Sequence, residues 1–369
     1  MTHPSSARSI DFTSALYLGL RHPSWALGPW RRFTTGVPAA LCEPASAGSI
    51  AQELAALTGC ERVLLGTSTL HLFWDLFQGL VDARSIIYMD AGLYPIARWG
   101  IERAAARGVP VHEIPHHDPR PLRRLLQESP RRRPVMVTDG FCPRCGRSAP
   151  LAAYLEAVER AGGRLVIDDT QALGVLGRDP SRQAPYGRGG GGSLAWSSLR
   201  SPDVIVVASL AKGLGVPMAM LAGNDAAVSR FEAMSETRVH CSPPSVAALH
   251  ASAHALAVNR AHGDTLRTRL VALVSLFRRE LSRAGFPVVG GRFPVQTLAT
   301  VRGDAAVRLH GALRRQGIVT VLRRDTEGLG PRLTCLLTAR HSGGDVTAMA
   351  RALATSDRAR PVAAAMGEP

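Results

Sequence analysis

The feature that most constrains the fold is a regular alternation of short apolar segments with amphipathic ones. Apolar, β-branched runs of strand length predict strands at residues 62–66, 85–90, 109–115, 134–140, 164–170 and 202–209. Segments with helical spacing predict helices at residues 49–59, 71–83, 94–108, 119–129 and 151–163. This alternation is typical of a mostly parallel sheet that helices cover on both faces. In such sheets, ligands bind at the carboxyl ends of the strands.

Changes in sequence texture divide the 369 residues into four parts. The predicted parts are an N-terminal arm (1–45), a large domain (46–243), a small α+β domain (244–355) and a disordered tail (356–369). In the small domain, the pattern predicts one long helix or two in series over 242–285, strands at 294–301 and 331–338, and helices at 305–317 and 344–354.

The apolar segments and the cysteines indicate in which cellular compartment the protein is expected. The N-terminus has no apolar signal core, and no apolar run approaches the ~20 residues needed to span a bilayer. We therefore expect neither secretion nor membrane insertion. Six cysteines scattered through a long chain do not resemble a disulfide framework, and they favour a reducing cytoplasm.

The basic residues carry a sharper signal, because Lys212 is the only lysine among 44 lysines and arginines. Arginine can replace lysine wherever only a solvated cation is needed. It cannot replace a primary amine that must lose its proton and attack a carbonyl. Lys212 is therefore a candidate Schiff-base nucleophile, and the alternative is the chance survival of one lysine.

A formal charge of +15 and a pI near 10.8 raise nucleic-acid binding as a function of another class. Against it, the arginines are spread over all the predicted elements, and aromatic residues make up only 5% of the chain. We therefore regard the arginine content as compositional bias. A catalytically inactive protein that retains a cofactor is a further alternative.

Three predicted strand ends converge on one chemistry. The strand 62–66 runs into Thr67 and Ser68 at the start of a helix, which favours an anion site, although many such turns look alike. The strand 164–170 carries Asp168, which is expected to face a ligand, with a metal site as the alternative. A helix cap by Asp169 or Thr170 is compatible with that contact. The strand 202–209 ends in Ser209, just before Lys212. A phosphate site, an acid and an amine are what pyridoxal 5′-phosphate (PLP) requires.

Four motifs give the chain a resemblance to a known family. They are YLGLRHP (17–23), VIDDTQALGVLG (166–177), SLAKGLG (209–215) and PRLTCLLTARHSGGDV (331–346). In order and approximate spacing they resemble motifs of the fold type I PLP enzymes (aminotransferase class I/II), in particular the α-oxoamine synthases. That family includes 8-amino-7-oxononanoate synthase and glycine C-acetyltransferase. The resemblance implies a seven-stranded-type, mostly parallel sheet with a small C-terminal α+β domain, and a homodimer.

The resemblance also implies a role for each matching residue. Lys212 would bind the cofactor aldehyde and then act as base or acid at Cα, and Asp168 would pair with the pyridine nitrogen. Tyr94 would stack on the ring, and Gln171 would bond its phenolic oxygen. The phosphate would contact Thr67, Ser68, Ser209 and Ser242, the last reaching the partner's site. Arg332 would bind the substrate carboxylate by its bidentate fork.

Several departures from the family pattern bear on the reaction. Tyr94 and Gln171 replace family histidines, and a phenol donates a proton less readily near neutrality than an imidazolium does. The acidic loop of the family is the basic segment Cys142–Arg147 here. These changes keep the PLP prediction and weaken that of acyl transfer. The leading hypothesis is condensation of an amino acid with an acyl-CoA or acyl-carrier thioester. Transamination with the same lysine is the alternative, and decarboxylase or lyase chemistry is a third possibility.

Other motifs support weaker interpretations. Cys142 and Cys145 lack the further ligands of a zinc site, so we predict no metal and favour two thiols lining a pocket. His116, His117 and Asp118 suggest a solvated turn in which Asp118 caps a helix. The glycine run within 186–194 could approach a phosphate, but such a run is more often a flexible surface loop.

Overall fold

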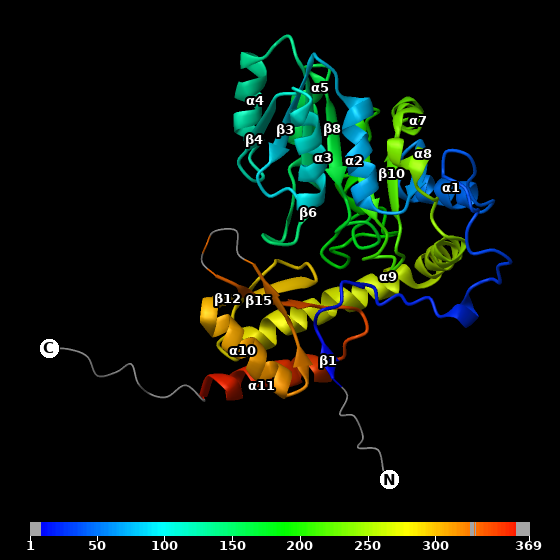
Figure 1. Cartoon of the computed structure of the whole chain (residues 1–369). Helices are drawn as coiled ribbons and strands as arrows, with labels where there is room; N and C mark the ends of the chain where they lie inside the picture. Colours follow the sequence, from blue (N-terminus) through cyan, green and yellow to red (C-terminus); the bar gives the residue numbers. More distant parts are fainter. Residues whose placement is uncertain (1–8, 325–327, 329, 359–369) are drawn as a thin grey trace. The chain divides into compact units, whose positions relative to one another are not determined.

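The computed structural model describes residues 9–324, 328 and 330–358, which form two compact units (Figure 1). The large unit comprises Leu18–Cys142 and Ser148–Arg267. The small unit comprises Pro143–Arg147 and the described parts of Met1–Tyr17 and Thr268–Pro369. The boundary therefore divides one long helix, α9 (Val246–Arg283), after Arg267. The four-part division by sequence texture stays a prediction.

A seven-stranded sheet forms the centre of the large unit. In spatial order its strands are β2 (Arg62–Gly66), β10 (Ala219–Gly223), β9 (Val204–Ser209), β8 (Arg164–Asp168), β5 (Arg133–Asp139), β3 (Ser85–Asp90) and β4 (Val111–Ile114). Neighbouring strands are parallel, except that β10 runs antiparallel to both β2 and β9. The predicted mostly parallel sheet is confirmed. Strand β10 was not predicted, because its sequence AMLAG lacks the β-branched residues that signal a strand.

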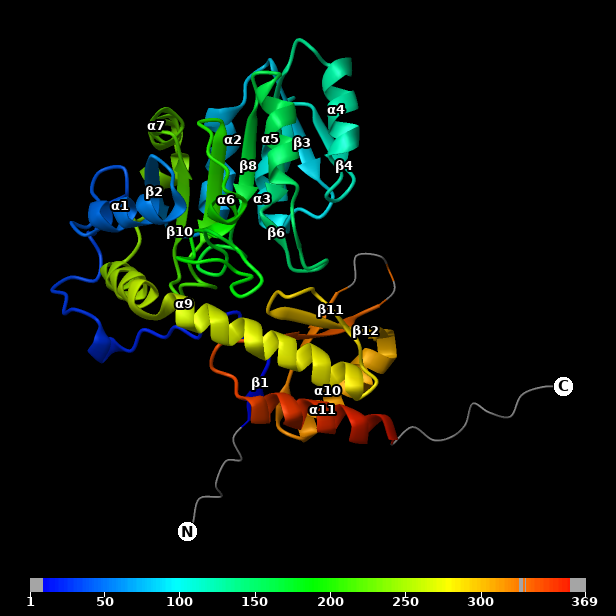
Figure 2. The same cartoon turned by 180° about the vertical axis from the view of Figure 1, so that it is seen from behind.

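Helices cover both faces of this sheet (Figures 1 and 2). One face carries α2 (Thr69–Leu80), α3 (Pro95–Ala106) and α7 (Asp225–Met234). The other carries α4 (Pro119–Glu128) and α5 (Leu151–Glu159). Apolar side chains that alternate along the strands, such as Ile87 and Val207, pack with Phe73 and Phe77 of α2 in a buried core. Burial on both faces explains why the strands read as continuous apolar runs.

Shorter elements complete the large unit. They are a 3-10 turn (Ser24–Ala26), α1 (Ala47–Thr58), β6 (Phe141–Cys142), α6 (Gly192–Ser197) and α8 (Glu236–His240). A two-residue strand, β7 (Arg147–Ser148), lies at the boundary of the units. In the described part of the chain, no helix combines the length and the apolar character needed to cross a bilayer.

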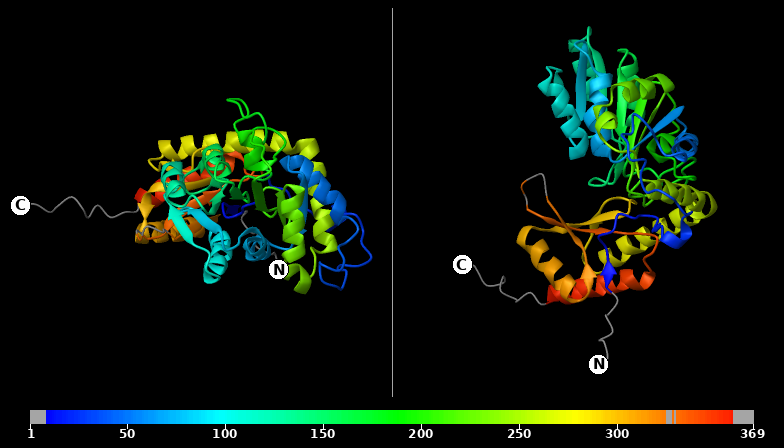
Figure 3. Two further views of the ribbon diagram at one scale, coloured as in Figure 1. Left: turned by 90° about the horizontal axis from the view of Figure 1, so that it is seen from above. Right: turned by 45° about the vertical axis from the view of Figure 1, so that its right-hand side comes forward.

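The small unit is an α+β structure, as predicted. Its antiparallel sheet has the spatial order β11 (Val288–Val289), β12 (Val295–Arg302), β15 (Arg332–Leu336) and β14 (Val321–Arg323). The strand β1 (Ile10–Asp11) pairs in parallel with β13 (Ile318–Val319), so two segments some 300 residues apart in the sequence lie side by side (Figures 1 and 3).

The remaining helices of the small unit are α10 (Gly303–Arg315) and α11 (Gly343–Arg358). The helical backbone of α11 continues to Arg358, and disorder of the tail 356–369 stays a prediction. The remainder of the predicted tail, 359–369, lies outside the described residues.

Candidate active site

The carboxyl ends of the parallel strands bring the predicted chemistry to one edge of the large unit's sheet. Ala219 of β10 pairs with Gly66 on one side and with Ser209 on the other, so the ends of β2 and β9 are level. Asp168, the last residue of β8, pairs with Asp139, the last residue of β5. The register of the sheet therefore aligns the phosphate-type turn, the serine and two acids along this edge.

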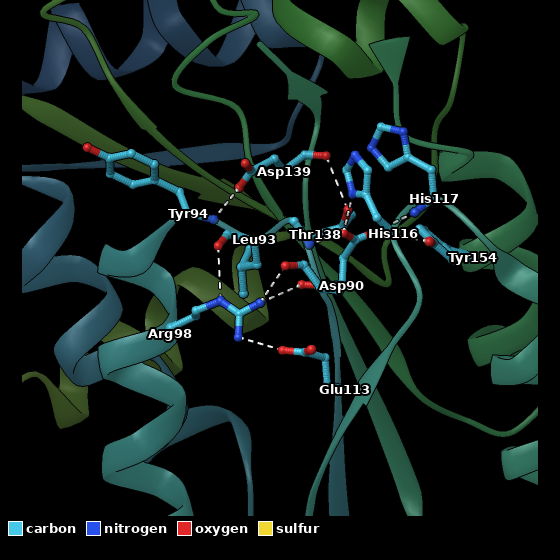
Figure 4. A network of polar contacts seen from close by, with 12 residues as sticks. Asp90, Leu93, Tyr94, Arg98, Glu113, His116, His117, Thr138, Asp139 and Tyr154 are labelled. Atoms are coloured by element: carbon cyan, nitrogen blue, oxygen red, sulfur yellow. Dashed lines mark hydrogen bonds and ion pairs between the residues drawn. The ribbon is translucent and has the colours of Figure 1, made fainter. Parts of the chain in front are cut away.

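Lys212 follows β9 and approaches Tyr94. Its Nζ lies 5.7 Å from the centre of the Tyr94 ring, and 52% of the tyrosine remains exposed. Tyr94 precedes α3, where Pro95 occupies the first turn and needs no N–H partner. The backbone N–H of Tyr94 donates to Asp139 at 3.2 Å (Figure 4). The structure thus brings the predicted nucleophile and the predicted stacking ring together.

Arg98 of α3 holds the segment that carries Tyr94. Its guanidinium donates to the carbonyl oxygens of Leu93 at 3.1 Å and of Ala91 at 2.8 Å, and it pairs with Glu113 at 2.7 Å (Figure 4). These bonds tie the loop after β3 to the first turn of α3. They restrict the position of the Tyr94 ring, which points away from the neighbouring histidines (Figure 4).

Burial shifts the pKa values of the lysine and the two acids. Desolvation lowers the pKa of Lys212, while the charges of Asp168 and Asp139 oppose that shift. Burial raises the pKa of Asp168, against hydrogen bonds from Thr170, and it raises that of Asp139, which the charge of Asp168 raises further. A lysine with a lowered pKa has more of the neutral amine that attacks a carbonyl.

Hydroxyl groups gather at the other end of the site. Ser68 caps α2 by accepting from the backbone N–H of His71 at 3.4 Å. The Nδ1 atom of His71 lies 2.7 Å from Ser68 Oγ and 3.2 Å from Thr67 Oγ1. Ser209 Oγ accepts from the backbone N–H of Ala211 at 3.2 Å. A small cavity is lined by Thr67, His71, Cys241 and Ser242, among others. Ser242 therefore lies beside Thr67 of its own chain.

Two further predicted site residues, Gln171 and Arg332, lie in a turn of the large unit and in a strand of the small unit. Gln171 lies three residues after Asp168 in the turn that follows β8, and it is partly buried. Arg332 belongs to β15 of the small unit, where its guanidinium donates to the carbonyl oxygens of Leu298 at 3.3 Å and of Ala299 at 3.4 Å. The ring contact of Gln171 and the substrate contact of Arg332 stay predictions.

Sequence reasoning did not select Asp139 or His71. Asp139 ends an apolar strand in the sequence VTDG, as Asp168 ends another, so the same strand-end rule applied to 134–140 would have found it. No sequence signal marks His71, because its role depends on the helix turn that brings its ring back to Ser68.

The histidine turn after β4 differs from the solvated turn that the sequence suggested. Asp118 caps α4 by accepting from the N–H of Arg120 at 3.0 Å, which confirms that part of the interpretation. His116, however, is 19% exposed and bonds Asp90 through Nδ1 at 2.6 Å. Asp90 also accepts from the Tyr154 hydroxyl at 3.2 Å (Figure 4). The hydrogen bond to the buried Asp90 at the end of β3 therefore explains why His116 is mostly buried and not solvated.

The glycine run is packed, so the expectation of a flexible surface loop is wrong. The Gly189 N–H donates to Asp264 Oδ1 at 2.9 Å, and its carbonyl accepts from Asn259 Nδ2 at 2.8 Å. Arg267, only 2% exposed, donates to the Gly174 carbonyl at 2.8 Å. Side chains of α9 therefore hold the run, and its glycines leave room for that close approach.

The run also lies behind the lysine turn. The Gly174 N–H donates to the Gly190 carbonyl at 2.8 Å. On its other side, Gly174 packs against Gly213, the residue after Lys212, and a Cβ added at Gly174 would lie 3.0 Å from the Gly213 backbone. The backbone of the glycine run thus contacts Gly174, and Gly174 contacts Gly213, the residue that follows Lys212.

Comparison with known proteins assigns the family. Residues 38–353 match the sequence profile of aminotransferase class I and II. The chain is similar to the 8-amino-7-oxononanoate synthase of Aromatoleum aromaticum, with 32% identity over 81% of this chain and 75% of that protein. The enzyme of that name from Nitrosococcus oceani is 28% identical over 94% of this chain and 91% of its own length. The chain belongs to the aminotransferase class I and II family. It is a PLP-dependent transferase.

Solved structures of low sequence identity have the same fold. The serine palmitoyltransferase of Sphingomonas wittichii matches with a TM-score of 0.81 and 18% identity, over 95% of this chain and 88% of that chain. The 8-amino-7-oxononanoate synthase of Francisella tularensis matches with a TM-score of 0.73 and 14% identity, over 95% and 98%. The fold class predicted from the motifs is therefore confirmed.

The donor set at the sheet edge fits PLP. The phosphate needs N–H groups and hydroxyls at a helix start, which Thr67 and Ser68 provide at α2. The pyridine nitrogen needs an acid, and Asp168 is a buried one. The aldehyde needs an amine, and Lys212 is the only one that a side chain of this protein offers. Its approach to the Tyr94 ring places an aromatic face near the same point.

Proposed function

We propose that this protein condenses an amino acid with an acyl thioester to give an amino ketone and a free thiol. A bond forms between Cα and the acyl carbon while the C–S bond of the thioester breaks. Cα loses either a proton or its carboxylate, the latter as carbon dioxide. The observation that carries the proposal is the 5.7 Å approach of Lys212 Nζ to the Tyr94 ring, at the edge where Asp168 is buried. The name shared by the relatives supports this choice of reaction.

Lys212 has two tasks in this proposal. Its amine would hold the cofactor, and its lowered pKa favours the neutral form that this requires. The same amine would take or return the proton at Cα of the substrate. Bound PLP would supply an electron sink for the pair left at Cα.

The neighbouring residues would bind and orient. Asp168 would keep a proton on the pyridine nitrogen, and Tyr94 would cover one face of the ring. Thr67, Ser68 and Ser209 would bind the phosphate, and Ser242 would reach the phosphate site of the partner subunit. Gln171 would bond the phenolic oxygen. Arg332 would bind the amino-acid carboxylate. The acyl donor would be a thioester of coenzyme A or of an acyl carrier.

We also propose a homodimer in a reducing compartment, the cytoplasm. Large apolar side chains stay exposed on the segment 24–42 and on α2 and α3, and a second copy could cover them: Trp25, Phe33, Leu41, Trp74 and Trp99. All six cysteines are free thiols, which supports a reducing setting. Light scattering on the purified protein would measure its mass, and a stable monomer would contradict the dimer.

Product analysis tests the reaction. The PLP-loaded protein is incubated with single amino acids, with and without an acyl-CoA, and released thiol and the state of the cofactor are measured. We expect thiol release that requires both substrates and is lost in Lys212→Ala. Conversion of the cofactor to its amine form by an amino acid alone would identify an aminotransferase instead. Failure to incorporate PLP would refute the role of Lys212.

A further inference from the structure

His71 occupies an unusual position beside the hydroxyls at the start of α2. Its Nδ1 atom lies 2.7 Å from Ser68 Oγ and 3.2 Å from Thr67 Oγ1, so one ring nitrogen contacts both groups. Ser68 Oγ already accepts from the His71 backbone N–H at 3.4 Å. Thr67 and His71 line the small cavity that Cys241 and Ser242 also line.

The direction of these hydrogen bonds depends on whether Nδ1 carries a proton. A hydroxyl has one proton to donate, and an unprotonated imidazole nitrogen can only accept. If Nδ1 lacks a proton, the Ser68 hydroxyl donates to it. A phosphate dianion has no proton to share, so it also requires donors from these hydroxyls. The two demands on the same hydroxyl proton conflict.

Of the charged and titratable groups among the described residues that line the cavity, only the histidine is placed to donate a proton to these hydroxyls. From α8, Arg238 lines the cavity, but its guanidinium pairs with Glu43 at 2.6 Å and with Glu232 at 3.1 Å. Cys241 is the other titratable group in the lining, and a thiol is a weak donor. The neutral imidazole has one donor and one acceptor nitrogen, so it can present an Nδ1–H to the hydroxyls without breaking an ion pair.

We propose that His71 belongs to the phosphate-binding subsite and carries a proton on Nδ1 when phosphate is bound. The Nδ1–H then donates to the oxygens of Ser68 and Thr67, and both hydroxyls donate to the phosphate. His71 acts through these hydroxyls and is therefore a positioning residue. The inference rests on PLP as the cofactor.

Binding of PLP and of pyridoxal, which lacks the phosphate, tests the proposal. Dissociation constants are measured by absorbance for the full-length protein, for His71→Ala and for the control His262→Ala, an exposed histidine on α9. We expect His71→Ala to weaken PLP binding by about 10- to 100-fold and to change pyridoxal binding less than about 2-fold, since only the phosphate uses a charge-assisted bond here. His262→Ala should change neither constant.

A pair of variants separates the proposed role from a purely structural one. His71→Asn keeps an amide N–H donor on a short side chain, whereas His71→Leu fills the space without a donor. His71→Asn should therefore bind PLP more tightly than His71→Leu, while the two bind pyridoxal alike. Equal weakening of PLP and pyridoxal in His71→Ala, or equal PLP affinity in His71→Asn and His71→Leu, would overturn the inference. Wild-type protein that binds neither compound would overturn the cofactor assignment itself.

Discussion

Replacement of Gly190 by alanine tests whether the glycine run supports the lysine turn. Gly190 has φ +80°, and an added Cβ would lie 2.6 Å from Arg267 Nη1 and 2.8 Å from the Gly174 carbonyl oxygen. Gly189 is a matched control. It has the same φ of +80°, but its added Cβ would meet nothing nearer than Arg178 Nη2 at 3.9 Å.

The structure separates two costs. A left-handed backbone costs a residue with a Cβ about 1–2 kcal/mol, and both variants carry this cost. Gly190→Ala must in addition displace Arg267 from the Gly174 carbonyl, to which it donates at 2.8 Å. Loss of a buried hydrogen bond from a charged group costs about 1.5–3 kcal/mol more. We therefore expect Gly190→Ala to be destabilised by about 3–5 kcal/mol and Gly189→Ala by about 1–2 kcal/mol.

Urea unfolding of the PLP-loaded variants, followed by tryptophan fluorescence, measures this difference. A displaced Gly174 would also move Gly213, so PLP affinity should fall in Gly190→Ala and stay near wild type in Gly189→Ala. If the two variants unfold at the same urea concentration, backbone strain alone accounts for the glycines. The packing argument would then be refuted.

Three other substitutions probe the site. Asp168→Asn should lower kcat by about 100-fold or more, because an amide does not stabilise a protonated pyridine nitrogen, and steady-state kinetics at saturating PLP would show it. Tyr94→Phe should bind PLP as the wild type does, because only the ring is needed for stacking. Tyr94→Ala should bind PLP about 3- to 10-fold more weakly. Equal PLP affinities of Tyr94→Phe and Tyr94→Ala in an absorbance titration would contradict ring contact. Burial raises the pKa of Asp169 from 3.8 to about 7, so the folded state holds a proton that the unfolded chain has released, and stability should fall as pH rises from about 4 to about 7. Asp169→Asn should lack that loss, and urea midpoints at pH 5 and pH 8 would reveal whether its advantage over the wild type grows with pH.

Local sequence was enough to place most of the sheet and the central chemistry. Strands such as β3 and β9 are short runs rich in β-branched and apolar residues, and they alternate with amphipathic segments, so the local pattern predicted their positions. The sequence also predicted the single lysine as a nucleophile, because arginine cannot serve as a neutral amine. It predicted the acid at the end of β8 as a ligand contact, because the carboxyl ends of parallel strands face the ligand. These signals need no knowledge of distant residues.

Tertiary structure decided the features that depend on contacts across the chain. Strand β10 lacks β-branched residues and exists because β2 and β9 pair with it on both sides. The glycine run looks flexible in isolation, yet Asn259 and Asp264 hold it from a helix some 70 residues away in sequence, and Arg267 of that helix bonds the adjacent Gly174. Burial raises the pKa of Asp139, and the sheet register, which sets it beside the charge of Asp168, raises that pKa further. Hydrogen bonds and electrostatic shifts of this kind depend on distance in space, and a sequence pattern carries only distance along the chain.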